Sequence, residues 1–128
     1  MGDITRRIGL RANDELIARN IVDTGFSQAN WIGSVNSPYI PPDIEGDSRR
    51  RGDPKTPRDY IETVLVPKYQ AEQESGKARI LTQQDFEPIF VSNAVPYVPL
   101  LNERGGRGGR GKGFIGEAVE EAVNIDVP

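Results

Sequence analysis

Apolar residues recur at the spacing of one helical face near the beginning of the chain. Over residues 3–21 they follow one another three or four positions apart, and charged side chains, mostly arginines, occupy the opposite face. The pattern predicts an amphipathic helix that ends before Asp23, Thr24 and Gly25, because glycine is favoured where a helix stops. The alternating run over residues 30–35 then predicts a short strand that buries Trp31 on one side.

A second helix is predicted to begin near residue 57. Thr56 suits the N-cap, Pro57 suits the first helical position, and Asp59 completes a capping box three residues after Thr56. Apolar residues at helical spacing follow. Pro67 is expected to kink or interrupt this helix, and Gly76 is expected to end it.

The second half of the chain alternates strand-like and helix-like patterns. Residues 78–82 and 87–93 resemble two strands that pair across a turn near residue 85. Residues 94–104 indicate an irregular turn followed by a short helical piece. The stretch 114–123 predicts a last helix, whose apolar face comprises Phe114, Ile115, Ala118, Val119 and Ala122.

The resulting order of elements is helix, strand, helix, strand, strand, helix, which is typical of an α+β protein. We therefore expect a small antiparallel sheet packed by an N-terminal helix, a middle helix and a C-terminal helix. The whole chain, residues 1–128, is predicted to form a single domain. Long polar loops are expected as insertions at about residues 36–55 and 103–113.

Composition excludes several classes of chemistry. The chain has no cysteine and no histidine, which excludes disulfides and thiol catalysis and removes the commonest general base and metal ligand. Hydrophobic residues make up 36% of the chain, beside 14 glycines and 10 prolines, so a modest core with long loops is expected. No apolar run approaches the ~20 residues that span a bilayer, and no signal peptide is visible. We expect a soluble chain without a membrane partner.

Basic residues gather in the two predicted loops although the net charge is -3. The second loop nearly matches a phosphate-binding loop, but Gly113 stands where a hydroxyl is required and no strand is predicted before it. Its many glycines are expected to leave it without a fixed conformation. We interpret both loops as solvated segments that meet an acidic partner surface or DNA phosphate. Their basic residues are Arg49, Arg50, Arg51, Arg104, Arg107, Arg110 and Lys112.

The triplet of Asp23, Thr24 and Gly25 also occurs in the catalytic loop of aspartic proteases, where two carboxylates share a proton. Strongly apolar strands would surround the triplet in such a protease, whereas here it follows a charged amphipathic helix. We therefore favour a structural turn between the helix and the strand with Trp31. A protease built on Asp23 remains an alternative, which predicts peptide cleavage that Asp23→Asn abolishes.

Three blocks of the sequence carry a family resemblance. They read IVDTGFSQANWIGSVNSP, IFVSNAVPYVPLLNERG and GFIGEAVEEA, in this order, within residues 4–123. Together they resemble the neck and tail-completion proteins of long-tailed bacteriophages. Residues 39–80 match no motif of that family. The chain also departs from the family pattern at Phe26 and in the abundance of glycine before the last helix.

The resemblance implies a virion structural protein without enzymatic activity and without a cofactor. Such a protein is assembled in the host cytoplasm as a homo-oligomeric ring, a hexamer or dodecamer, at the head–tail junction. The ring adjoins other neck, connector and tail proteins, and DNA passes through it without sequence-specific contacts. Architectural roles are implied for Asp23, Thr24, Gly25, Asn30, Trp31, Asn93, Pro96 and Tyr97.

A second hypothesis rests on the residues alone. The two basic loops could serve a nucleic-acid-binding accessory protein, because lysine and arginine neutralise phosphates and release counterions. Salt-sensitive DNA affinity of the isolated monomer would favour this alternative.

Overall fold

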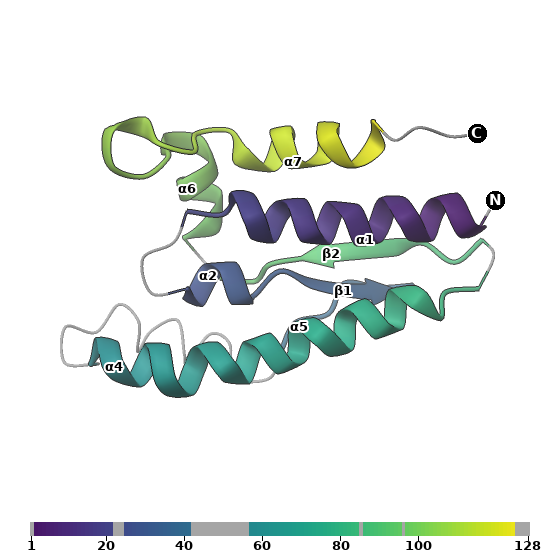
Figure 1. The fold of residues 1–128 in the computed structure, drawn as a ribbon, viewed down its shortest axis with the longest axis horizontal. Coiled ribbons are helices and arrows are strands. Elements are labelled where there is room, and N and C mark those ends of the chain that lie inside the picture. The colour runs from purple at the N-terminus through teal and green to yellow at the C-terminus, as the bar shows by residue number, and fades with distance from the viewer. Residues whose placement is uncertain (1, 22–24, 42–56, 85, 96, 125–128) are drawn as a thin grey trace.

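The structure is a computed structural model that describes residues 2–21, 25–41, 57–84, 86–95 and 97–124 (Figure 1). It is an α+β protein in which helices pack around a small antiparallel sheet, as predicted. Its elements are α1 (Gly2–Arg19), α2 (Phe26–Ala29), β1 (Ile32–Val35), α4 (Arg58–Tyr60), a π-helical turn (Ile61–Leu65), α5 (Val66–Leu81), β2 (Ile89–Ser92), α6 (Val98–Arg104), a 3-10 turn (Arg107–Gly109) and α7 (Phe114–Val123).

The two strands form the centre of the fold. β1 and β2 pair antiparallel, with Ile32 opposite Ser92 and Val35 opposite Ile89. α5 lies along β1, α1 lies along β2, and α7 packs antiparallel to α1 (Figure 1). Because a two-stranded sheet is at best marginally stable in water by itself, the helices beside it are needed to stabilise it.

α5 approaches β1 unusually closely because glycines face each other. A Cβ atom on Gly76 would lie 2.7 Å from both the backbone nitrogen and the backbone oxygen of Gly33. The helix also supplies hydrogen bonds to the edge of the strand. Arg79 Nη2 donates to the Gly33 carbonyl at 3.1 Å, and Gln73 Nε2 donates to the Trp31 carbonyl at 3.2 Å. These side chains satisfy the carbonyls of Trp31 and Gly33, on the side of β1 where the described part of the chain places no further strand.

The predicted strand over residues 78–82 is wrong, because α5 continues as a helix to Leu81. Gly76 lies inside that helix instead of ending it, and it serves the contact with β1. Ile80 is fully buried, and its side chain lies beside Gly9 and Gly33. The predicted pairing is therefore wrong as well, since the partner of β2 is β1. A short apolar run fits either a strand or a buried helix segment, and the contact with β1 decides between them here.

The predicted start of the middle helix is shifted by one residue. Pro57 is the N-cap, with an extended ψ of 137°, and Arg58 is the first helical residue. Thr56, the expected cap, lies outside the described residues. Pro67 does not end the helix. It follows the π-helical turn Ile61–Leu65, and the α-helical pattern continues through α5. Changes of helix type of this kind accommodate local irregularities such as a proline.

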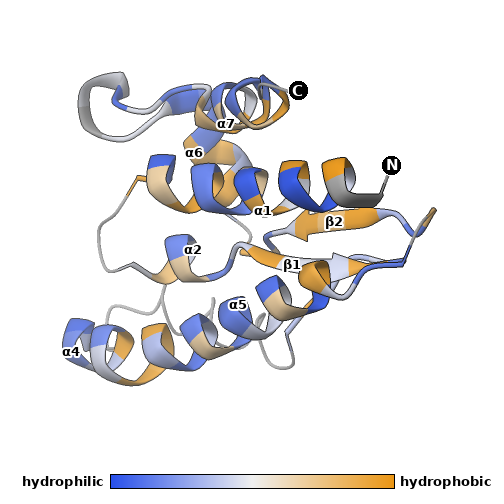
Figure 2. Ribbon diagram, turned by 45° about the vertical axis from the view of Figure 1, so that its right-hand side comes forward, coloured by the Kyte–Doolittle hydropathy of each residue, from blue (hydrophilic) through white to orange (hydrophobic). Residues whose placement is uncertain are grey.

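Two aromatic pairs in the core join α2 to α5 and the start of β1 to α7. Phe26 meets Tyr69 edge-to-face at a centroid distance of 5.6 Å, and Trp31 meets Phe114 in the same way at 6.3 Å. Figure 2 shows apolar colour on the strands and polar colour on much of the helical surface. The predicted burial of Trp31 is confirmed, whereas Val119, which the sequence places on the apolar face of the last helix, is 48% exposed. The buried cluster comprises Leu16, Phe26, Ala29, Trp31, Ile61, Leu65, Tyr69, Val95, Val98, Phe114 and Ala118.

Candidate architectural site and basic loop

The chain enters α2 through a left-handed glycine. Gly25 has φ 90° and ψ 0° and forms the N-cap of α2, and its carbonyl accepts the Ala29 N–H at 2.9 Å. Non-glycine residues rarely adopt this backbone conformation. The glycine was expected to stop α1, but the structure uses it to start the next helix.

A buried hydrogen-bond network surrounds α2. The Trp31 indole Nε1 donates to Asn20 Oδ1 at 2.8 Å. Asn20 Nδ2 in turn donates to Ser27 Oγ at 2.8 Å and to the Ile21 carbonyl at 2.9 Å. Asn20, Ser27 and Trp31 are all at least 95% buried, so these bonds replace water that the folded protein excludes. The network ties the end of α1 to α2 and to the start of β1.

The chain after β2 joins the same network. Asn93 Nδ2 donates to the Ser27 carbonyl at 2.8 Å, and Asn93 Oδ1 accepts the Val95 N–H at 3.0 Å. On α2 itself, Asn30 Nδ2 donates to the Phe26 carbonyl at 2.8 Å. α2 has only four residues and could not persist alone. Amide side chains from several elements therefore hold it in place.

Part of the implied architectural motif converges at this site. Gly25, Asn30, Trp31 and Asn93 lie around α2, and Tyr97 forms the N-cap of α6 and packs against the core. Asp23, Thr24 and Pro96 lie outside the described residues.

Sequence reasoning missed three contributors to this site, Asn20, Ser27 and Gln73. Gln73 Nε2 donates to the Gln28 carbonyl at 2.9 Å and so links α5 to α2. All three are buried polar residues within apolar surroundings. Asn20 ends a charged helix and Gln73 lies in the polar run of residues 68–77, so the sequence carries no local signal of their burial.

The glycine-rich segment after α6 has a defined conformation, so the prediction that it lacks one is wrong. Gly106 N–H bonds to the Arg110 carbonyl at 2.7 Å, and Gly113 N–H bonds to the Asn102 carbonyl at 2.7 Å. Asn102 also accepts the Ile115 N–H on its side-chain oxygen at 2.9 Å. These bonds close the segment at both ends and position the start of α7.

Because glycine has no side chain, the glycine-rich segment can pass closely around Ile21. A Cβ atom on Gly111 would lie 2.7 Å from Ile21 Cγ1, and one on Gly106 would lie 3.1 Å from Ile21 Cγ2. The segment follows helix α6, whereas a phosphate-binding loop follows a strand. The segment therefore resembles a phosphate-binding loop in sequence but lacks the preceding strand that such a loop requires.

The glycine-rich segment presents positive charge to solvent. Arg104, Arg110 and Lys112 are exposed, and their side chains make no ion pair with any other described residue. The side chain of Arg107 and the cluster of residues 49–51 lie outside the described part of the chain. Three unpaired cations on one ordered loop can bind an acidic protein surface or a phosphate backbone.

Two glycines of this segment are expected to differ sharply on substitution. Gly105→Ala places a Cβ atom 2.6 Å from the Gly109 carbonyl oxygen at a φ of 74°, so we expect a loss of about 2 kcal/mol or more. Gly108 has φ 70° with nothing within 4 Å of its Cβ position, so Gly108→Asn, which tolerates this conformation, is expected to cost less than about 0.5 kcal/mol. Urea unfolding followed by circular dichroism measures both changes. Equal losses would contradict the described loop geometry.

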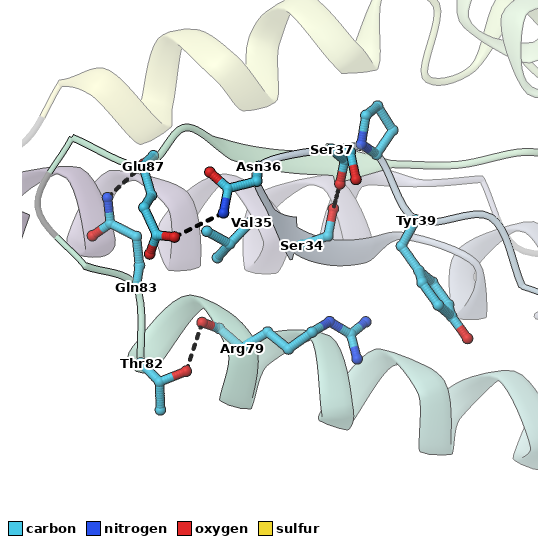
Figure 3. Close-up of a pocket in the computed structure, with 10 residues that line it drawn as sticks. Ser34, Val35, Asn36, Ser37, Tyr39, Arg79, Thr82, Gln83 and Glu87 are labelled. Carbon is cyan, nitrogen blue, oxygen red and sulfur yellow. Dashed lines mark hydrogen bonds between the residues drawn. The ribbon is translucent and has the colours of Figure 1, made fainter.

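A polar pocket of about 320 Å³ lies where β1 and β2 meet the end of α5 (Figure 3). Glu87 accepts hydrogen bonds from Asn36 Nδ2 and from the Gln84 N–H, both at 2.7 Å, and these bonds lower the pKa of the Glu87 carboxyl. Tyr39 OH donates to the Glu72 carboxylate at 2.6 Å, which raises the pKa of the Tyr39 phenol. These polar groups bind one another, so they hold the turns at this end of the sheet.

Comparison of the chain with protein-family models, curated proteins and solved structures found no match. Among the residues that the structure describes, no three acidic side chains are grouped so that they could hold a metal ion. No helix in the described ranges is both long enough and apolar enough to cross a membrane.

Proposed function

We propose that this chain is a virion structural protein that forms a ring at the head–tail junction of a long-tailed bacteriophage. In this role it joins the portal or connector side to the tail, contacts neighbouring neck and tail proteins, and lines the passage for DNA. It acts without catalysis and without a cofactor. The ring is a homo-oligomer of six or twelve copies, which are the numbers that the family resemblance implies.

The observation that supports this proposal most is the meeting of the three resembling blocks in one packed unit. Trp31 from the first block meets Phe114 from the third edge-to-face, at a centroid distance of 6.3 Å. Asn93 from the second block bonds to the Ser27 carbonyl in the first at 2.8 Å. Residues that a family motif keeps for architecture should contact one another in this way. The site around α2 therefore positions the helices and strands of the three blocks relative to one another.

The exposed cations of the glycine-rich segment, called the basic loop below, suit a ring that surrounds DNA. Unpaired cations at Arg104, Arg110 and Lys112 would meet acidic surface on a neighbour or passing phosphate. We extend the same role to Arg49, Arg50, Arg51 and Arg107 as part of the proposal.

Light scattering and electron microscopy test the proposed ring. The purified chain would be sized by multi-angle light scattering and imaged in negative stain, alone and mixed with portal or tail complexes. We expect a ring, either free or seated on a complex. A monomer that binds neither complex would contradict the proposal.

The basic loop supports a second candidate, a nucleic-acid-binding accessory protein. DNA titration of the monomer at two salt concentrations distinguishes the candidates, because phosphate contacts make affinity fall steeply with salt. A triple variant with Arg104, Arg110 and Lys112 changed to Gln would lose this affinity. A control that neutralises Arg7, Arg58 and Lys68 would retain it. Under the ring proposal, the monomer binds DNA weakly or not at all.

A further inference from the structure

α7 carries more apolar surface than its own fold buries. Phe114, Ala118 and Ala122 are at most 1% exposed. A second face of the helix points away from the core, at the i, i+3, i+4, i+7 spacing that places residues side by side. This face, the α7 outer stripe, comprises Gly116, Val119, Glu120 and Val123, all exposed to solvent.

No contact among the described residues explains the composition of the outer stripe. Val119 is 48% exposed and Val123 is 56% exposed. Gly116 weakens a helix relative to alanine, yet a Cβ atom there would meet nothing within 4 Å. Gly116 comes about one turn before the exposed Val119, and its lack of a side chain leaves a shallow notch at the N-terminal end of the stripe. Such a surface suits an external group that approaches the backbone closely.

The turn between α5 and β2 presents a complementary group. Phe86 is 92% exposed and has φ 71°, a backbone conformation that is rare for a bulky residue. The turn around it is held by three hydrogen bonds of Glu87, whose backbone oxygen accepts Gln83 Nε2 at 2.6 Å and whose carboxylate accepts the bonds from Asn36 and Gln84 given above. Figure 2 shows the resulting apolar tip on this loop. The turn therefore presents the aromatic side chain to solvent.

A cation and a second apolar side chain border the start of this turn. Leu81 is 62% exposed, and it shares a surface depression with Arg6 from α1. Arg6 Nη1 donates to the Gln83 carbonyl at 2.8 Å, which holds the arginine against the turn. We define Arg6, Leu81 and Phe86 as the basic apolar tip.

We infer that the basic apolar tip of one copy packs into the α7 outer stripe of a second copy. Phe86 would fill the notch over Gly116 beside the exposed Val119, and Arg6 would face Glu120. Glu120 makes no ion pair with another described residue, so its carboxylate is available. Aromatic residues and arginines are the usual anchors of protein interfaces.

This contact joins two different surfaces of the same chain, so it is heterologous. Heterologous contacts repeat from copy to copy and close into a ring when the rotation allows. The inference thus deepens the proposed ring by naming its subunit contact, and it rests on the proposed function only for the place of the ring in the virion.

Two variants of the full chain separate the halves of the contact. Phe86→Asn removes the anchor and keeps a residue that tolerates positive φ, and Val119→Lys places a cation in the outer stripe. Sedimentation velocity over a concentration series would measure self-association. We expect each variant to self-associate roughly 10- to 30-fold more weakly than the natural chain. Val64→Gln, at a 47% exposed apolar position outside both surfaces, is the matched control and should associate normally.

Mixing the variants tests whether the contact joins different surfaces. The Phe86→Asn chain keeps its stripe and the Val119→Lys chain keeps its tip, so an equimolar mixture should form heterodimers and nothing larger. Emission of the single tryptophan, Trp31, checks that each variant is folded. Unchanged self-association of either variant would overturn the inference, as would a natural chain that stays monomeric at all concentrations or a mixture without heterodimers. A ring that survives both substitutions on portal or tail complexes would overturn it while leaving the proposed function intact.

Discussion

Gly76→Ala is expected to destabilise the protein by about 2–4 kcal/mol, although the same change stabilises most helices. Gly76 lies in the middle of α5, where alanine has the better intrinsic propensity. The added Cβ atom would lie 2.7 Å from the backbone nitrogen and oxygen of Gly33 and 3.1 Å from Ile32 Cγ2. Backbone atoms of a strand cannot move aside as a flexible side chain can, so α5 would have to shift away from β1.

The hydrogen bonds across this contact would be lost with the same shift. Arg79 donates to the Gly33 carbonyl of β1, and Gln73 donates to the Trp31 carbonyl just before β1, from positions three residues on either side of Gly76. Moving the helix outward would leave those strand carbonyls without partners in a buried place, which adds to the steric cost.

Thermal and urea unfolding of Gly76→Ala, followed by circular dichroism, measures this loss. Gly116→Ala in α7 is the matched control, because it is also a helical glycine but nothing lies within 4 Å of its Cβ position. The control is expected to be neutral or stabilised by up to about 1 kcal/mol. Equal stabilisation by both substitutions would contradict the close packing of α5 on β1.

Asn20→Ala is expected to cost about 2–4 kcal/mol in the free energy of unfolding. Asn20 is 4% exposed and connects the Trp31 indole, the Ser27 hydroxyl and the Ile21 carbonyl. Alanine would leave the indole N–H and the hydroxyl without this partner in a place that water does not reach. Each buried polar group left unpaired costs about 1–3 kcal/mol, so the combined effect is large for an isolated polar residue.

Urea unfolding measures the change, with Asn124→Ala as the control. Asn124 is exposed at the end of α7, and its substitution should remain within about 0.5 kcal/mol of the natural chain. The emission of Trp31 in the folded state should change for Asn20→Ala and stay the same for the control. A loss below about 0.5 kcal/mol for Asn20→Ala would mean that the network does not hold α2 in place.

The site was only partly predictable from sequence. Trp31, Asn30 and Asn93 were singled out because they stand in motifs with a recognisable pattern. Asn20 was not, because an asparagine near the end of an amphipathic helix looks like any solvated polar residue until its partners are known. Its importance arises from Ser27 and Trp31, which the turn at Gly25 brings back toward α1.

The chain's own pattern determined the elements whose periodicity is local. The first and last helices could be predicted because their apolar residues recur at helical spacing, and the same holds for the strand after Trp31 and the α+β class. Only the tertiary structure decided the secondary structure of residues 78–82, since their short apolar run suits a strand as well as a helix. The contact of Gly76 and Ile80 with β1 selects the helix.

For the basic loop, the sequence determines the composition, whereas the tertiary structure determines the conformation. Its charge and its glycines are evident from the sequence, but glycine permits so many backbone states that local reasoning predicts none of them. The order of the loop comes from Asn102 and Ile21, which lie outside it and reach it only in the folded protein. Local patterns specify which elements form, whereas contacts between distant residues specify where glycine, asparagine and short apolar runs are placed.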